Sequence, residues 1–196
     1  MPNQLINAQI FPPDLWASAI RVDNQGSRAA RLFILGEAPG AEEERQGMPF
    51  VGDAGRLLFD LLSEMGVSRE DVFMANVVRF RPWSLTGAGN RKDRKPSTRE
   101  IEADGRVFKD DLAAVHPSVV LSLGVTAARE LGLNVRLGMT KLRGQQIDIG
   151  GIAVVPSFHP GYIRRDGRKK TLFIEDLQKC VRLLEDESLR RLAPSA

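Results

Sequence analysis

Four short apolar runs, each followed by turn-forming or polar residues, constrain the fold of this 196-residue chain most strongly. They lie at 32–35, 72–78, 119–123 and 152–156. Each run has the length of a buried β-strand, and the stretches between them carry apolar residues at helical spacing, as at 53–66 and 97–115. Strands that alternate with helices predict an α/β fold, specifically a three-layer α/β/α sandwich with a central, mostly parallel four-stranded sheet.

The remaining elements extend this prediction to a single domain over residues 1–196. Helices are expected at 53–66, 97–115, 126–131 and 171–192. Gly150 and Gly151 separate 145–149 from the last strand, so these two segments are expected to form a hairpin or to be neighbours. We divide the domain into an N-terminal extension (1–30), a core that carries the motifs (31–165) and the C-terminal helix.

Basic residues are concentrated in two places, although the net charge is only +3. The stretches 79–99 and 162–170 carry net charges of +6 and +4, which leaves −7 on the rest of the chain. A polyanionic partner would explain this distribution. On charge alone, two solvated loops explain it equally well.

The apolar residues and the single cysteine restrict the environment of the protein. No stretch approaches 18 consecutive apolar residues, and the N-terminus lacks the basic-then-apolar pattern of a secretory signal. Cys180 is alone, so no disulfide framework is possible within the chain, and its place on an apolar helix stripe predicts a buried structural thiol. We therefore expect a cytoplasmic protein without a membrane segment.

Polar or glycine-rich segments follow three of the predicted strands. Gly36-Glu37-Ala38-Pro39-Gly40 follows the first, Asn76 lies near the end of the second, and His159-Pro160-Gly161 comes after the last. Because ligands bind at the carboxyl ends of parallel strands, these clusters are expected to converge on one edge of the sheet. Each residue also has an ordinary structural interpretation: a solvated acid for Glu37, a core aromatic for Phe50, a turn residue for Asn76 and a structural histidine for His159.

Taken together, five motifs resemble a known family. They are 36–40 with Glu43-Glu44, 49–52 with Gly55, 76–78, 89–91 and 159–162. Their order and spacing are similar to those of family 4-type uracil-DNA glycosylases, from about Arg31 to Arg165. The resemblance implies a DNA repair enzyme that flips uracil out of the stack and hydrolyses its N-glycosidic bond, leaving an abasic site. No lysine accompanies the motifs as a Schiff-base nucleophile, so a monofunctional enzyme is expected.

The resemblance also implies roles for individual residues. Phe50 would stack on the flipped base, Asn76 would pair with its Watson–Crick edge, and His159 would donate a hydrogen bond to O2 of the departing base. Glu37 would position the attacking water or stabilise the sugar cation, with Glu43 as a second catalytic acid. Backbone contacts with the base are expected from Gly36, Ala38, Pro39 and Gly40. Ala38 stands where the best-known uracil glycosylases carry an aspartate, which leaves the general base open.

The basic stretches would bind the DNA backbone. The segment after His159 resembles the wedge loop of the superfamily, with Ile163 or Tyr162 filling the vacated stack. The expected DNA-binding residues are Arg79, Arg81, Asn90, Arg91, Lys92, Tyr162, Ile163, Arg164 and Arg165. The expected partner is uracil-containing DNA, and the expected state is a monomer.

The sequence departs from the family in two respects. Most family 4-type enzymes hold an iron–sulfur cluster with four cysteines, but here Phe80 stands at the third position and Asp104 near the fourth. We therefore expect no cofactor and no metal. The stretch 83–95 resembles the inserted loop of a branch that links covalently to DNA through a loop histidine, but it contains no histidine, so no covalent adduct is expected. Alternative functions are removal of other deaminated bases, or binding of single-stranded or damaged DNA without catalysis.

Overall fold

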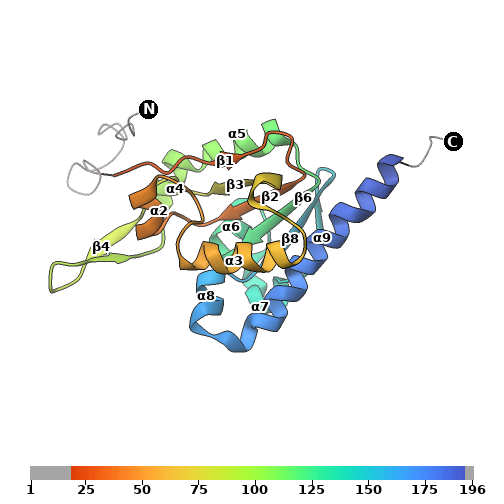
Figure 1. Cartoon of the computed structure of the whole chain (residues 1–196). Coiled ribbons are helices and arrows are strands. Elements are labelled where there is room, and N and C mark those ends of the chain that lie inside the picture. The colour runs from red at the N-terminus through yellow and green to blue at the C-terminus, as the bar shows by residue number, and fades with distance from the viewer. Residues whose placement is uncertain (1–18, 193–196) are drawn as a thin grey trace.

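A six-stranded sheet forms the centre of the protein, of which the computed structural model describes residues 19–192. The strand order is β1-β3-β2-β6-β8-β7 (Figure 1). The strands are β1 (Gln25–Gly26), β2 (Leu32–Gly36), β3 (Val72–Asn76), β6 (Val119–Leu123), β7 (Ile147–Ile149) and β8 (Ile152–Ser157). The central four are parallel, whereas β1 and β7 are antiparallel edges. The α/β fold is confirmed, as is the pairing of 145–149 with the last strand, but the predicted count of four strands included neither β7 nor the unpredicted β1.

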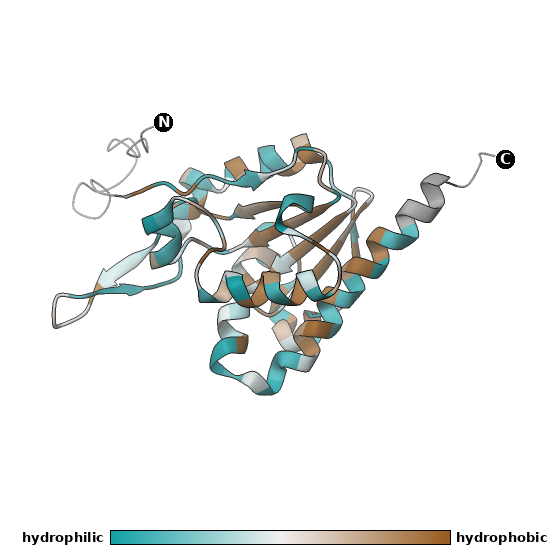
Figure 2. Ribbon diagram, viewed as in Figure 1, coloured by the Kyte–Doolittle hydropathy of each residue, from teal (hydrophilic) through white to brown (hydrophobic). Residues whose placement is uncertain are grey.

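Helices cover both faces of the sheet, which explains why β2, β3 and β6 are buried throughout. On one face lie α3 (Asp53–Glu64) and α9 (Lys170–Leu192), which share an apolar cluster that includes Leu62 and Phe173. On the other face lie α4 (Thr98–Asp104), α5 (Arg106–Val115) and α6 (Gly124–Glu130), with a cluster around Phe108 and Ala127. Figure 2 shows apolar strands between helices that are apolar on one side only. Cys180 is buried in α9, as predicted, and burial raises the pKa of its thiol.

The predicted helix over 97–115 is two helices. Its start is as predicted, because Ser97 and Glu100 form a capping box at the beginning of α4. Gly105 then ends α4 and begins α5, at a residue type that stabilises a helix interior poorly. Three short helices have no counterpart among the predictions: α2 (Ala41–Gln46), α7 (Met139–Leu142) and α8 (Pro160–Arg165). Single 3₁₀ turns occupy Arg69–Asp71, Val135–Leu137 and Gly167–Lys169.

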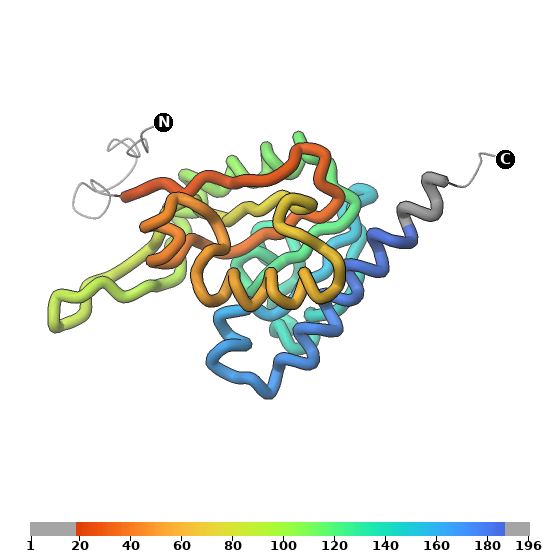
Figure 3. Tube along the Cα trace, in the orientation of Figure 1, coloured from red at the N-terminus to blue at the C-terminus, as the bar shows by residue number. Residues whose placement is uncertain are grey.

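Part of the predicted N-terminal extension belongs to the sheet. Gln25 of β1 pairs with Met74 of β3, and Arg21, four residues before Gln25, pairs with Phe80. The segment 20–26 therefore lies along β3, as its course beside that strand shows in Figure 3. The rest of the extension, 1–18, lies outside the described residues, as do the last four residues of the chain.

The basic stretch after β3 forms a hairpin that projects from the body (Figure 3). Its strands are β4 (Trp83–Leu85) and β5 (Arg91–Asp93), which pair antiparallel. The guanidinium of Arg91 lies over the ring of Trp83, 4.3 Å from its centroid. Within residues 19–192, no helix is long and apolar enough to cross a membrane.

Candidate active site

The carboxyl ends of three parallel strands meet at one cavity. Gly36 ends β2, Asn76 ends β3, and His159 follows β8. Asn76, Phe50 and His159 line a cavity of about 440 Å³. The predicted convergence of these residues on one sheet edge is therefore confirmed, and we call this space the base cavity, after the prediction that a flipped base enters it.

A glycine at position 36 lets Asn76 and Phe50 approach the backbone closely. A Cβ atom at Gly36 would lie 2.5 Å from Oδ1 of Asn76 and 2.8 Å from Cζ of Phe50. Any larger residue would therefore displace one of these two side chains.

Phe50 is held in a strained conformation. Its φ of 56° lies in the left-handed region, which a bulky residue rarely adopts. The guanidinium of Arg69 donates a hydrogen bond to the Phe50 carbonyl (3.1 Å) and another to the Pro49 carbonyl. Gly55 packs so closely that a Cβ there would lie 2.1 Å from the same Phe50 oxygen. Strain that is stabilised by its surroundings in this way is typical of functional sites.

Glu43 joins the two loops that border the base cavity. One carboxylate oxygen accepts from the backbone N–H of Gly40 (3.1 Å), and the other accepts from that of Gly52 (2.7 Å). Both oxygens are thus used to hold main chain. Glu43 also lines the base cavity, and the catalytic role expected for it stays a prediction.

Glu37 is not among the residues that line the base cavity. Its carboxylate accepts a hydrogen bond from the hydroxyl of Thr126, a buried residue in α6. Glu37 lines a second cavity of about 370 Å³, and His159 lines both cavities. His159 therefore lies between the two cavities, whereas Glu37 borders the second.

His159 caps helix α8. Its Nδ1 accepts a hydrogen bond from the backbone N–H of Gly161 (3.1 Å), so the proton of the neutral ring is on Nε2. Burial lowers the pKa of His159 below its ordinary value; the positive charge of Arg165 acts in the same direction, and Glu37 opposes both. His159 is therefore neutral at neutral pH, with one N–H available to a ligand.

A buried ion pair that the sequence analysis missed supports the segment before His159. Asp176 of α9 is fully buried and accepts from Nε of Arg143 (2.9 Å) and from the hydroxyl of Ser157 (2.5 Å). Asp176 also lies close to Gly144, where a Cβ would come within 2.7 Å of its Oδ1. The available signal was an aspartate on the helix stripe that carries Leu177 and Cys180.

Two predicted DNA-binding arginines are used inside the protein. Arg79 pairs with Asp104 at 2.6 Å, and its side chain is 11% exposed. The side chain of Arg81 is 12% exposed and pairs with Asp93 (2.6 Å) and Glu44 (3.3 Å). Their charges are matched and largely enclosed, which does not favour the predicted contact with DNA.

The predicted wedge residues differ in exposure. Ile163 is 2% exposed and packs in the core, so its position does not fit the predicted insertion into DNA. Tyr162 is 36% exposed, and its ring lies beside that of Phe158. The other predicted DNA-binding residues are exposed: Asn90, Arg91, Lys92, Arg164 and Arg165.

Comparison with known proteins decides the family. Residues 24–182 match the family model described as the uracil DNA glycosylase superfamily. This chain belongs to that superfamily. It is 36% identical to the type-4 uracil-DNA glycosylase of Thermotoga maritima, over 85% of this chain and 84% of the relative. It is 31% identical to the type-4 enzyme of Saccharolobus solfataricus, over 86% and 78%. The chain thus groups with the type-4 branch of the superfamily.

A solved structure of SMUG2 from Pedobacter heparinus is similar to this chain. The match covers 83% of this chain and 76% of the SMUG2 chain, with a TM-score of 0.54 and 13% sequence identity. This likeness supports the fold alone. Among residues 19–192, no group of three or more His, Cys, Asp or Glu side chains could hold a metal ion.

Proposed function

We propose that this chain is a DNA repair glycosylase that hydrolyses the N-glycosidic bond of a flipped-out uracil and leaves an abasic site. The observation that carries the proposal is the base cavity, in which the Asn76 amide and the Phe50 ring both pack against Gly36. The glycosidic bond is inaccessible in a duplex, so a base must leave the stack to enter such a cavity.

Asn76 distinguishes uracil from cytosine in this proposal. Uracil presents a donor at N3 and an acceptor at O4, whereas cytosine reverses both. Asn76 is 4% exposed, and a Cβ at position 36 would lie 2.5 Å from its Oδ1, so the side chain has little room to change rotamer. Cytosine would leave the amide mispaired, at a cost of about 1–3 kcal/mol.

His159 stabilises the leaving group. When the glycosidic bond breaks, uracil departs with the electron pair, and its O2 gains negative charge. The Nε2–H of neutral His159 donates a hydrogen bond to that oxygen, and a preorganised donor of this kind contributes about 3–4 kcal/mol. Glu37, held by Thr126, stabilises the positive charge on the sugar and orients the water that attacks C1′.

An assay with three substrates tests this function. Oligonucleotides that contain uracil, hypoxanthine or xanthine are incubated with the protein, and abasic sites are detected by alkaline cleavage. We expect cleavage at uracil. Cleavage only at the other bases would favour the alternative substrate range, and binding without abasic sites would favour a non-catalytic protein. Lys95 lines the second cavity, and a lysine near the sugar could form a Schiff base with it. Borohydride, which traps such a Schiff base covalently, is therefore included, and the proposed monofunctional enzyme should form no trapped adduct.

DNA contacts are proposed for the exposed cations on the hairpin and on α8. Lys92→Ala and Arg165→Ala are each expected to weaken DNA binding. Each should also reduce the steepness of the plot of log association constant against log salt concentration by about 1, as expected for the loss of one phosphate contact. Lys109→Ala is the control, because this lysine of α5 is 54% exposed and pairs with Glu130 away from both cavities. Equal salt slopes for all variants would argue against this DNA-binding surface.

We infer that the chain functions without an iron–sulfur cluster and as a monomer. At the third and near the fourth of the four expected cysteine positions, Phe80 is fully buried and Asp104 is paired with Arg79 and Arg21. This donor set does not fit the cluster, because it offers no thiolate, and Cys180 is buried in α9.

Purified protein is accordingly expected to be colourless. It should lack absorbance near 400 nm and contain no stoichiometric iron or sulfide, even after anaerobic purification. A family member whose sequence has the four cysteines, prepared in parallel, controls for cluster loss during handling. Iron and sulfide that copurify with this chain in fixed ratio would contradict the inference.

A further inference from the structure

The main chain around Asn76 interrupts the regular pairing of the sheet edge. Gln25 lies opposite Met74, whereas Arg21 lies opposite Phe80. Four residue steps on the N-terminal segment therefore span six on the β3 side, which leaves two extra residues after Met74. Irregular pairing of this kind re-aims side chains next to functional sites. Asn76 lies within this interruption, where no regular β1 partner faces it.

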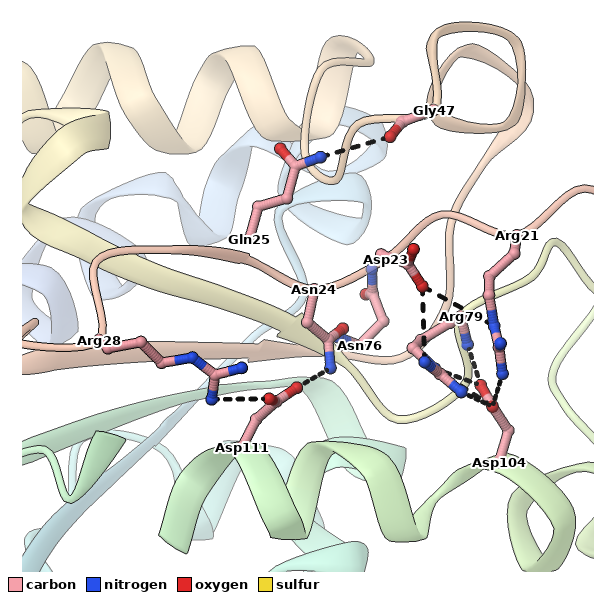
Figure 4. A network of polar contacts seen from close by, with 10 residues as sticks. All are labelled: Arg21, Asp23, Asn24, Gln25, Arg28, Gly47, Asn76, Arg79, Asp104 and Asp111. Carbon is pink, nitrogen blue, oxygen red and sulfur yellow. Dashed lines mark hydrogen bonds and ion pairs between the residues drawn. The ribbon is translucent and has the colours of Figure 1, made fainter. Parts of the chain in front are cut away.

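The side chain of Asn24 bridges the gap. Its Oδ1 accepts a hydrogen bond from the backbone N–H of Asn76 (3.1 Å), and its Nδ2 donates to Asp111 of α5 (2.8 Å). Asp111 also pairs with Arg28 at 2.9 Å, so its carboxylate is held from two sides. Figure 4 shows Asn24 between Asn76 and Asp111, with Arg28 on the far side of the aspartate.

The opposite side of the Asn76 backbone is held by β2. The N–H of Val77 donates to the Gly36 carbonyl (3.0 Å), and the N–H of Val78 donates to that of Glu37 (3.3 Å). On the side of Asn76 that faces the N-terminal segment, where regular strand pairing is interrupted, the side chain of Asn24 thus provides the hydrogen bond that holds the main chain. Without it, the buried N–H of Asn76 would lack its acceptor, and the peptide could move toward another.

We propose that Asn24 is a positioning residue: through Asp111 it fixes the main chain of Asn76 and so holds the amide that selects the base. This inference rests on the proposed function, because the role assigned to Asn76 belongs to that function. Asn24 itself touches neither the base nor the sugar. Small displacements of a positioned group slow a reaction strongly, so the expected effect is on the chemical step.

A donor–acceptor swap tests the inference. Asn24→Asp keeps an acceptor for the Asn76 N–H but places a carboxylate against Asp111. Asp111→Asn alone still offers Asn24 an acceptor. In the double variant, the new asparagine at 111 donates to the new aspartate at 24, and the bridge is restored. Asn24→Ala removes the bridge in either background.

The readout is the single-turnover rate of uracil release with enzyme in excess, measured well below the melting temperature of every variant. We expect Asn24→Ala and Asn24→Asp to be about 10- to 100-fold slower, with affinity for uracil-free DNA unchanged. Asp111→Asn should stay within about threefold of the wild type and should rescue Asn24→Asp but not Asn24→Ala. Equal rates for Asn24→Ala and wild type, or no rescue in the double variant, would overturn the inference.

Amide hydrogen exchange at Asn76, followed by NMR, separates this inference from the proposed function. Exchange at least about tenfold faster in Asn24→Ala than in wild type, restored in the swap variant, supports the bridge. Unchanged exchange refutes it. A wild-type protein that releases no uracil contradicts the proposed function instead, and the exchange measurement still decides whether Asn24 holds Asn76.

Discussion

Replacing His159 with asparagine is expected to slow uracil release about 10²- to 10³-fold, which corresponds to the loss of one preorganised donor to the leaving group. Asparagine is a favoured N-cap residue, so its side-chain oxygen can accept from the Gly161 N–H as Nδ1 of His159 does. It carries no group in the place of Nε2. The single-turnover rate should therefore fall while α8 and the melting temperature are preserved.

His159→Ala is the matched comparison. It removes both the donor and the cap, so its rate should fall as far as that of His159→Asn, with an additional loss of stability of about 1 kcal/mol. DNA affinity should stay unchanged in both variants, because the exposed cations are untouched. A His159→Asn enzyme as fast as the wild type would remove His159 from the mechanism.

The pH dependence of the rate follows from the lowered pKa of His159. Protonation would place an N–H on Nδ1 against the N–H of Gly161, which breaks the cap. Burial and Arg165 keep the pKa of His159 below that of a free imidazole. As the pH is lowered, the rate should therefore stay constant past the pKa of a free imidazole and decline only at lower pH. Arg165→Ala removes one cause of the lowering, so the acid limb should move to higher pH. Arg165→Lys keeps the charge and should leave the limb in place.

The sequence predicted where the site lies better than it predicted which of the basic residues are free to bind DNA. Strand ends are determined by local runs, and parallel strands bring their carboxyl ends to one edge, so Asn76 and His159 could be placed together. Arg79 and Arg81 lie in the same basic stretch as Lys92, and composition treats them alike. Their partners Asp104 and Glu44 are 25 and 37 residues away, so only the tertiary structure shows that these charges are matched.

Helix α8 shows a signal that was present but unused. A capping residue followed by proline at the first helical position, as in His159-Pro160, predicts a helix start. A helix over Pro160–Arg165 turns Ile163 and Tyr162 to different sides, one into the core and one to solvent. A loop would have left both available. The edge strand β1, by contrast, is two residues long, too short for any periodicity to indicate it.

Replacing Asp176 with alanine is expected to destabilise the protein by about 3–5 kcal/mol, because the largely enclosed guanidinium of Arg143 loses its buried partner and keeps only the exposed Glu175 as a counter-charge. The side chain of Asp176 is fully buried and that of Arg143 is 14% exposed. The hydroxyl of Ser157 loses its acceptor at the same time. For a domain of this size, the melting temperature should fall by about 6–20 °C, as measured by thermal or urea unfolding.

Glu175→Ala provides the matched control. Glu175 is the neighbouring residue of α9 and pairs with the same Arg143 at 3.3 Å, but its side chain is 53% exposed. Solvent screens this pair, so its loss should cost at most about 1 kcal/mol. Similar losses of stability in the two variants would show that the buried Arg143–Asp176 pair stabilises the protein no more than the exposed Arg143–Glu175 pair does. Replacing Arg143 and Asp176 together with leucine should recover much of the loss, because it is the unpaired charge, rather than the absent bond, that destabilises the single variant.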